Sequence, residues 1–131
     1  MNIGEVVRRS GLGEHTLRYY EKIGLLPPIR RDTAGQRQFA PDDLRLLEFL
    51  VKLRRTRMPL DQMRRYVQLL RRGEATLGER RAMIEAHEAQ VRAAIAEMQS
   101  CLEAVQAKVE LYRKWEREAA AAAPPPSQET R

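Results

Sequence analysis

The chain has 131 residues, which is enough for one compact domain and little more. It carries 24 Lys and Arg against 18 Asp and Glu, a net charge of +6, and 43% of its residues are hydrophobic, so its composition is that of a folded, basic protein. No apolar run is long enough to span a membrane and no signal-peptide core is present, so we expect a cytoplasmic protein that contacts no membrane. A single cysteine cannot form an internal disulfide, which agrees with a reducing compartment.

The positive charge is concentrated in the first half of the chain. Residues 1–72 hold 16 Lys and Arg against 8 Asp and Glu, a net of +8, whereas residues 73–131 hold 8 against 10, a net of −2. This division predicts one module that binds a polyanion and a second module with another task. A general bias toward arginine would also produce a basic chain, and the motifs decide between the two explanations.

Two short helices are predicted at the start of the chain. The Asn-x-x-Glu pattern at residues 2–5 is typical of a capping box, and Gly11 ends the helix that follows. Gly13 is a suitable N-cap for a second helix over about residues 14–23, and Gly24 is a suitable residue for its C-terminal end. Two short helices joined by a turn that contains glycine make a helix-turn-helix.

The second predicted helix has one apolar face and one polar face. Leu17, Tyr20 and Ile23 share the apolar face, so we expect them in the core. The opposite face carries His15, Arg18, Tyr19 and Lys22. Two cations, a phenol and an imidazole suit phosphate oxygens and base edges in a major groove, so this helix is a candidate for reading double-stranded DNA.

A small hairpin is predicted directly after this helix. Pro27 and Pro28 favour extended backbone, and two short extended segments then flank a turn that contains Gly35. The hairpin carries Arg30, Arg31 and Arg37. A basic hairpin beside a reading helix is a wing, which would reach the flanking DNA backbone or the minor groove.

Two further helices complete the predicted N-terminal domain, residues 1–73. Pro41 suits the first position of a third helix, and basic residues cluster at the end of that helix, where Arg57 marks a candidate second wing. A fourth helix follows Pro59 and stops at Gly73. It contains the apolar residues Met63, Val67 and Leu70.

A long helix is predicted over residues 76–118, with a Thr-x-x-Glu capping box at residues 76–79. Its apolar residues repeat in steps of three, four and seven: Ile84, Val91, Ile95, Met98, Leu102, Val105, Val109 and Tyr112. Such a stripe must be buried, and a second copy of the chain is its natural cover, which gives a coiled-coil homodimer. The alanine- and proline-rich residues 119–131 have no core, so we expect a disordered tail.

Four segments of the chain match a known pattern: Ile3–Val6, Thr16–Leu26, Gly35–Phe39 and Asp43–Leu44. Through them the first 70 residues resemble the MerR family of bacterial transcriptional regulators, and the long helix resembles that family's antiparallel dimerisation helix. The resemblance implies a mainly α fold, with a winged helix-turn-helix followed by an antiparallel coiled coil.

The resemblance also assigns residues to DNA. It implies contacts from Thr16, Arg18 and Tyr19 on the reading helix and from Arg37 on the wing, to which the helix face and the second wing add His15, Lys22 and Arg57. The chain departs from the family pattern at three places. Gln36 stands where Tyr is usual, Ala40 where a capping Ser or Thr is common, and Arg57 where Gly is common.

The mechanism that the resemblance implies is promoter distortion. A dimer would bind a pseudo-palindromic site between promoter elements and twist the spacer so that RNA polymerase can use both elements. The residues themselves support dimeric DNA binding, and the twisting step comes from the resemblance alone. A DNA-binding architectural protein that senses nothing is the alternative function. An enzyme is disfavoured, because the chain has no nucleophile–base pairing and no phosphate-binding loop.

The signal to which such a regulator would respond is an unknown small effector. Cys101 has no second cysteine or nearby histidine, so we expect no metal site and no cofactor. The chain looks most like the aldehyde- and thiol-stress-responsive members, although Lys52 takes the place of their reactive cysteine. Cys101 is then either a half-buried coiled-coil residue or the sensor. Tyr112 and Trp115 either pack against the partner's DNA-binding domain or line an effector pocket, and His87 is expected at the solvent or the dimer interface.

Overall fold

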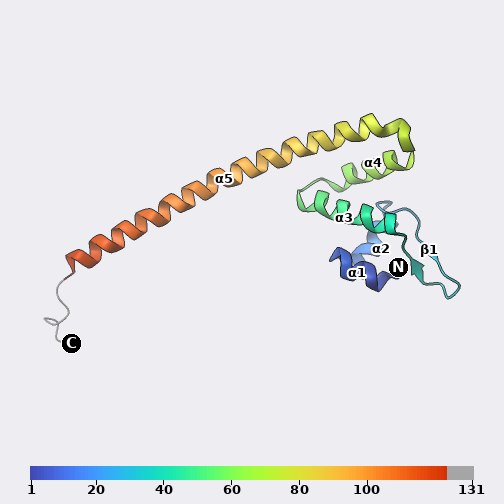
Figure 1. Ribbon diagram of the computed structural model, residues 1–131, viewed down its shortest axis with the longest axis horizontal. Helices are drawn as coiled ribbons and strands as arrows, with labels where there is room; N and C mark the ends of the chain where they lie inside the picture. Colours follow the sequence, from blue (N-terminus) through green and yellow to red (C-terminus); the bar gives the residue numbers. More distant parts are fainter. Residues whose placement is uncertain (124–131) are drawn as a thin grey trace. The chain divides into compact units, whose positions relative to one another are not determined.

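The structure is a computed structural model that describes residues 1–123 (Figure 1). Its elements in chain order are α1 (Ile3–Ser10), α2 (Glu14–Lys22), β1 (Arg30–Arg31), β2 (Arg37–Gln38), α3 (Pro41–Arg55), α4 (Leu60–Arg71), the 3₁₀ helix η1 (Gly73–Thr76) and α5 (Leu77–Ala122). The predicted mainly α class with a small wing is confirmed. The chain divides into two compact units, Met1–Glu88 and the part from Ala89 onward, and each is described by itself.

The core of the N-terminal unit is made by the apolar faces of its helices. Leu17 and Tyr20 of α2 are buried as predicted, and the fully buried Leu47 and Leu50 of α3 belong to the same cluster. The start of the chain is tied to this core, because the Met1 amine donates to the Phe39 carbonyl at 2.9 Å and the Phe39 N–H donates to the Met1 carbonyl at 2.7 Å. The reading helix therefore stands on a packed base.

The end of α2 is a glycine turn that directs the chain toward the wing. Gly24 has a φ of 84°, the left-handed region that favours glycine. Its N–H donates to the Glu21 carbonyl at 3.2 Å, and the Leu25 N–H donates to the Tyr20 carbonyl at 2.8 Å. These two bonds make a Schellman motif, and Leu25 and Tyr20 are both buried in the core cluster.

The end of α3 repeats this motif with an arginine in the glycine position. The Arg57 N–H donates to the Arg54 carbonyl and the Met58 N–H donates to the Leu53 carbonyl, both at 3.0 Å. Arg57 has a φ of 71° and is the only non-glycine residue among the described residues with a positive φ. A residue with a side chain in this region costs about 1 kcal/mol relative to glycine. The departure from the family pattern at Arg57 is therefore a site of backbone strain.

The turn between α4 and α5 differs from the prediction. Thr76 is not the N-cap of a capping box: it is buried, and its hydroxyl lies 2.6 Å from the Leu69 carbonyl and 2.9 Å from the Gly73 carbonyl, to which it donates. Because η1 folds back onto α4, the structure buries Leu69, while Leu70 is half-buried.

The end of α5 also differs from the prediction. The helix continues to Ala122, so the start of the predicted tail is wrong for Ala119–Ala122. Alanine is the strongest helix former, and this run extends the last turn of the helix without any core to pack against. The remainder of the predicted tail, residues 124–131, lies outside the described residues. Within residues 1–123, no helix combines the length and the apolar character of a membrane-spanning segment.

The two Schellman motifs form a matched pair for a stability test. Arg57→Gly should raise the free energy of unfolding by up to about 1 kcal/mol, because glycine relieves the strained φ. Gly24→Ala should lower it by about 1 kcal/mol, because an added Cβ meets no atom within 4 Å and only the left-handed backbone resists it. Urea unfolding at one fixed protein concentration measures both. A loss of stability in Arg57→Gly would contradict this account of the turn.

Candidate DNA-binding surface

The polar face of α2 is open to solvent, as its spacing predicts. His15, Arg18 and Lys22 are exposed, and Tyr19 is 45% exposed. Thr16 is half-buried at the edge of this face. Arg18 pairs with Glu14 one turn earlier, and both side chains are about half exposed. A surface pair of this kind stabilises a helix by less than about 1 kcal/mol, so a phosphate can readily replace the carboxylate as the partner of Arg18.

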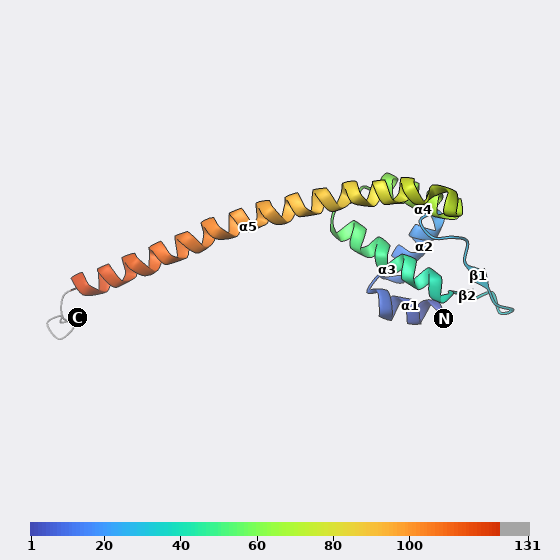
Figure 2. The ribbon, with the colours of Figure 1, turned by 45° about the horizontal axis from the view of Figure 1, so that its top comes forward.

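The predicted wing is present as a two-stranded antiparallel hairpin (Figure 2). In its register Arg30 lies opposite Gln38 and Arg31 lies opposite Arg37. The Arg31 Nη1 atom donates to the Gly35 carbonyl at 2.8 Å across the turn. The exposed side chains of Arg30 and Arg31 thus stand on a braced turn.

Asp32 organises the tip of this wing, a role that sequence reasoning missed. Its Oδ1 accepts from the Ala34 N–H at 2.9 Å and from the Gln36 N–H at 3.0 Å, and its Oδ2 accepts from Gln38 Nε2 at 3.3 Å. The position of an aspartate at the start of a glycine-containing turn is the signal that would have found it.

Glu21 joins the wing to the reading helix, and it too was missed. Its Oε1 accepts from Arg37 Nε at 3.1 Å, and its Oε2 accepts from the Ile29 N–H at 3.1 Å. Only 19% of the Arg37 side chain and 23% of the Glu21 side chain are exposed. Arg37 therefore has a structural bond in addition to the DNA contact that the resemblance assigned to it.

A basic groove of about 520 Å³ lies between α1, the start of α2 and the wing. The arginines that line it come from four elements: Arg8 from α1, Arg18 from α2, Arg31 from β1 and Arg37 from β2. Glu14 is the acidic residue of the lining and is already paired with Arg18. A groove with this surplus of guanidinium groups attracts a polyanionic strand.

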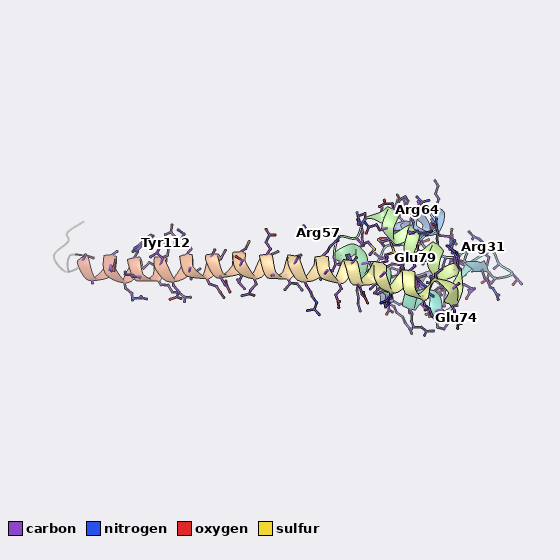
Figure 3. The ribbon with its side chains drawn as sticks, turned by 90° about the horizontal axis from the view of Figure 1, so that it is seen from above. Arg31, Arg57, Arg64, Glu74, Glu79 and Tyr112 are labelled. Carbon is purple, nitrogen blue, oxygen red and sulfur yellow. The ribbon has the colours of Figure 1, made fainter. Side chains whose placement is uncertain are left out.

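The second predicted wing is the turn between α3 and α4. Arg57 is exposed there, and Arg54 Nη1 donates to the Met58 carbonyl at 3.2 Å, which holds the turn to α3. Arg57 and Arg31 lie at opposite ends of the N-terminal unit in Figure 3, and in Figures 1 and 2 α2 lies between this turn and the hairpin. The reading helix is thus flanked by a basic turn on each side.

The residues assigned to an effector all lie on the exposed surface of α5. Cys101 is a free, exposed thiol. Tyr112 and Trp115 are 56% and 46% exposed, and their rings meet edge to face with centroids 5.3 Å apart. Among residues 1–123, no three His, Cys, Asp or Glu side chains gather in a group that would hold a metal ion.

His87 lies elsewhere than predicted. The structure does not place it at the solvent, because only 7% of it is exposed and its Nε2 lies 2.7 Å from Thr56 Oγ1. The periodicity of α5 could not show this, since the partner belongs to another helix 31 residues earlier in the chain.

The sequence of the chain matches known proteins along most of its length. The model of the family described as "MerR HTH family regulatory protein" matches residues 1–70. An uncharacterized HTH-type transcriptional regulator of Haemophilus influenzae is 34% identical over 110 residues, which are 84% of this chain and 82% of that protein.

Solved structures match the fold as well. A crystal structure described as a MerR family transcriptional regulator from Listeria monocytogenes has a TM-score of 0.85 at 34% identity, with 92% of each chain covered. The crystal structure of HiNmlR, a MerR family regulator lacking the sensor domain and bound to promoter DNA, has a TM-score of 0.79 at 32% identity, with 92% of this chain and 93% of that chain covered.

The Glu21 carboxylate gives a test of how the wing is held. Glu21→Ala should speed hydrogen exchange of the Ile29 amide by about tenfold or more, because that N–H loses its acceptor. Glu21→Gln is the matched control, since its amide oxygen still accepts one of the two bonds without the charge. Exchange measured by NMR checks both variants. Equal exchange rates in the wild type and in Glu21→Ala would show that Glu21 does not anchor the wing.

Proposed function

This chain belongs to the MerR family of helix-turn-helix regulatory proteins and is a DNA-binding transcriptional regulator, and from that membership we propose how it holds a promoter. The observation that carries the proposal is the set of basic side chains that α2, the hairpin and the Arg57 turn of the N-terminal unit present. Each part of this surface suits one feature of B-form DNA.

The exposed face of α2 enters the major groove. An α-helix fits that groove. The Arg18 and Lys22 side chains donate to guanine or to phosphate oxygens, and Tyr19 and His15 contact the DNA at the margins of the same helix face. Thr16, which is half-buried at the edge of this helix face, adds a hydroxyl that can donate to the DNA backbone. The buried Leu17 and Tyr20 prevent the helix from rotating away from this orientation.

The DNA backbone beside the major groove lies in the basic groove between α1 and the wing. Arg8, Arg31 and Arg37 line it and supply several donors to successive phosphates. On the other side of α2, Arg57 contacts the backbone from the second turn. Affinity that rests on such contacts falls steeply as the salt concentration rises.

The functional unit is a homodimer formed through α5. Ile95, Met98, Leu102, Val105 and Val109 are between 44% and 70% exposed in the single chain and repeat at heptad spacing. Burying each such side chain stabilises an assembly by about 1 kcal/mol or more, and a second copy of the same helix has the matching stripe. A two-fold dimer then presents two reading helices to a pseudo-palindromic site.

The same dimer would distort the promoter spacer for RNA polymerase. Bending or twisting of DNA between two half-sites costs on the order of several kcal/mol, and backbone contacts from two wings in each protomer offset that cost. We place the response to a small effector on α5, where the thiol of Cys101 and the Tyr112–Trp115 pair are accessible.

Arg18→Ala tests the DNA surface. The dimer should bind promoter DNA roughly tenfold to a hundredfold more weakly. The plot of log K against log salt has a negative slope, and its magnitude should decrease by about 0.9 for each phosphate that no longer has a guanidinium partner, or by about 2 in the dimer. Fluorescence anisotropy at four salt concentrations measures both quantities. Arg113→Ala is the control, because Arg113 is also an exposed helix arginine paired with a glutamate, Glu110. An unchanged slope in Arg18→Ala would refute its phosphate contact.

Leu102→Glu tests the dimer. A buried carboxylate in the apolar stripe is left without a partner, so the variant should be a monomer at micromolar concentration while the wild type is a dimer. Gln106→Glu, which adds the same charge outside the stripe, should remain a dimer. Analytical ultracentrifugation distinguishes the two states. A dimeric Leu102→Glu protein would mean that α5 is covered in another way.

A further inference from the structure

The buried His87 joins α5 to the turn that carries Arg57. Its Nε2 lies 2.7 Å from the hydroxyl oxygen of Thr56, the C-cap of α3, and Arg57 is the next residue. Both partners belong to the N-terminal unit, Met1–Glu88, so this contact lies within one compact body. Only 7% of His87 is exposed, and none of the proposed DNA contacts requires a buried histidine on α5.

The hydrogen bonds around Thr56 fix where the proton lies. The Thr56 hydroxyl lies 2.8 Å from the Lys52 carbonyl and 3.0 Å from the Leu53 carbonyl, and carbonyls only accept. The single hydroxyl proton is therefore used toward α3, and the Thr56 oxygen accepts from the Nε2–H of His87. His87 Nδ1 then carries the lone pair, and this atom has no partner among the described residues. The other tautomer would bury an N–H without an acceptor, which is the costlier arrangement.

These bonds converge on the one strained backbone position of the described chain. Arg57 has a φ of 71° without being glycine, and a turn in this conformation persists only when its surroundings determine it. The backbone bonds of the Schellman motif join residues of α3 and of the turn that follows it, whereas the bond to the His87 imidazole comes from a different helix, α5.

We propose that His87 is a positioning residue for the second wing: through the Thr56 hydroxyl it holds Arg57 in the left-handed turn that directs the guanidinium to a DNA phosphate. This inference rests on the proposed phosphate contact of Arg57. It also assigns a consequence to α5, because a shift of this helix that moves His87 from Thr56 releases the second wing and weakens DNA binding without any change in the reading helix.

The first test is local order in the full-length protein. His87→Leu removes the donor and keeps an apolar side chain of similar bulk, and Thr56→Val removes the acceptor. Both variants should speed hydrogen exchange of the Arg57 and Met58 amides by about tenfold or more. The matching amides of the other Schellman motif, Gly24 and Leu25, are the internal control and should not change. His87→Gln keeps an N–H donor and should retain most of the protection.

The second test separates positioning from general destabilisation. Arg57→Ala should reduce the magnitude of the salt slope of promoter binding by about 2 in the dimer, and His87→Leu should also reduce that magnitude. In the Arg57→Ala background, His87→Leu should have no further effect on affinity, because the group that it positions is absent. Thr56→Val should behave as His87→Leu does.

The outcomes separate the positioning role of His87 from the phosphate contact of Arg57. An equal loss of affinity from His87→Leu in both backgrounds, or exchange that rises equally at the Gly24 and Arg57 turns, overturns the positioning role of His87 and leaves the DNA surface intact. An unchanged slope in Arg57→Ala overturns the phosphate contact at the second wing, and the inference falls with it. The Arg18→Ala measurement reports on the reading helix independently of both.

Discussion

The arrangement of the proposed DNA surface depends on the carboxylate of Glu21. Its two oxygens hold the base of the wing against the reading helix, one through Arg37 Nε and the other through the Ile29 N–H. The hairpin has only two residues in each strand, and a ladder so short is not stable by itself. The half-buried position of the ion pair protects it from water and salt more than a surface pair. The spacing between α2 and the wing follows from this anchor.

The two ends of the surface are built from the same motif with different residues. After α2 the left-handed position is Gly24, which takes it without strain, and the chain there only has to turn. After α3 the same position is Arg57, where the strained backbone presents an exposed guanidinium at the second turn. A residue that lowers stability at a place where glycine would fit is the pattern expected when function is retained at the expense of stability.

The parts of the fold that local spacing determines could be predicted from the sequence. The helix-turn-helix, the four outward residues of α2 and the hairpin follow from glycine positions and from helical periodicity. The polar partnerships could not be predicted, because Arg37 finds Glu21 16 residues away and His87 finds Thr56 31 residues away. Thr76 shows the same limit: its position before a glutamate resembles a cap, but the 3₁₀ turn buries its hydroxyl against Leu69.

Stability and DNA reading meet in α5. Its first turns belong to the N-terminal unit, where Ile84 packs against the core and His87 bonds to Thr56, while its later residues present the apolar stripe. Within the N-terminal unit, the bond between His87 and Thr56 is the one that we propose to hold the second wing, whereas the Glu21 anchor keeps the reading helix and the first wing together. This division separates the turn that we propose to contact only the DNA backbone from the helix that we propose to contact the bases, so each can be altered without the other.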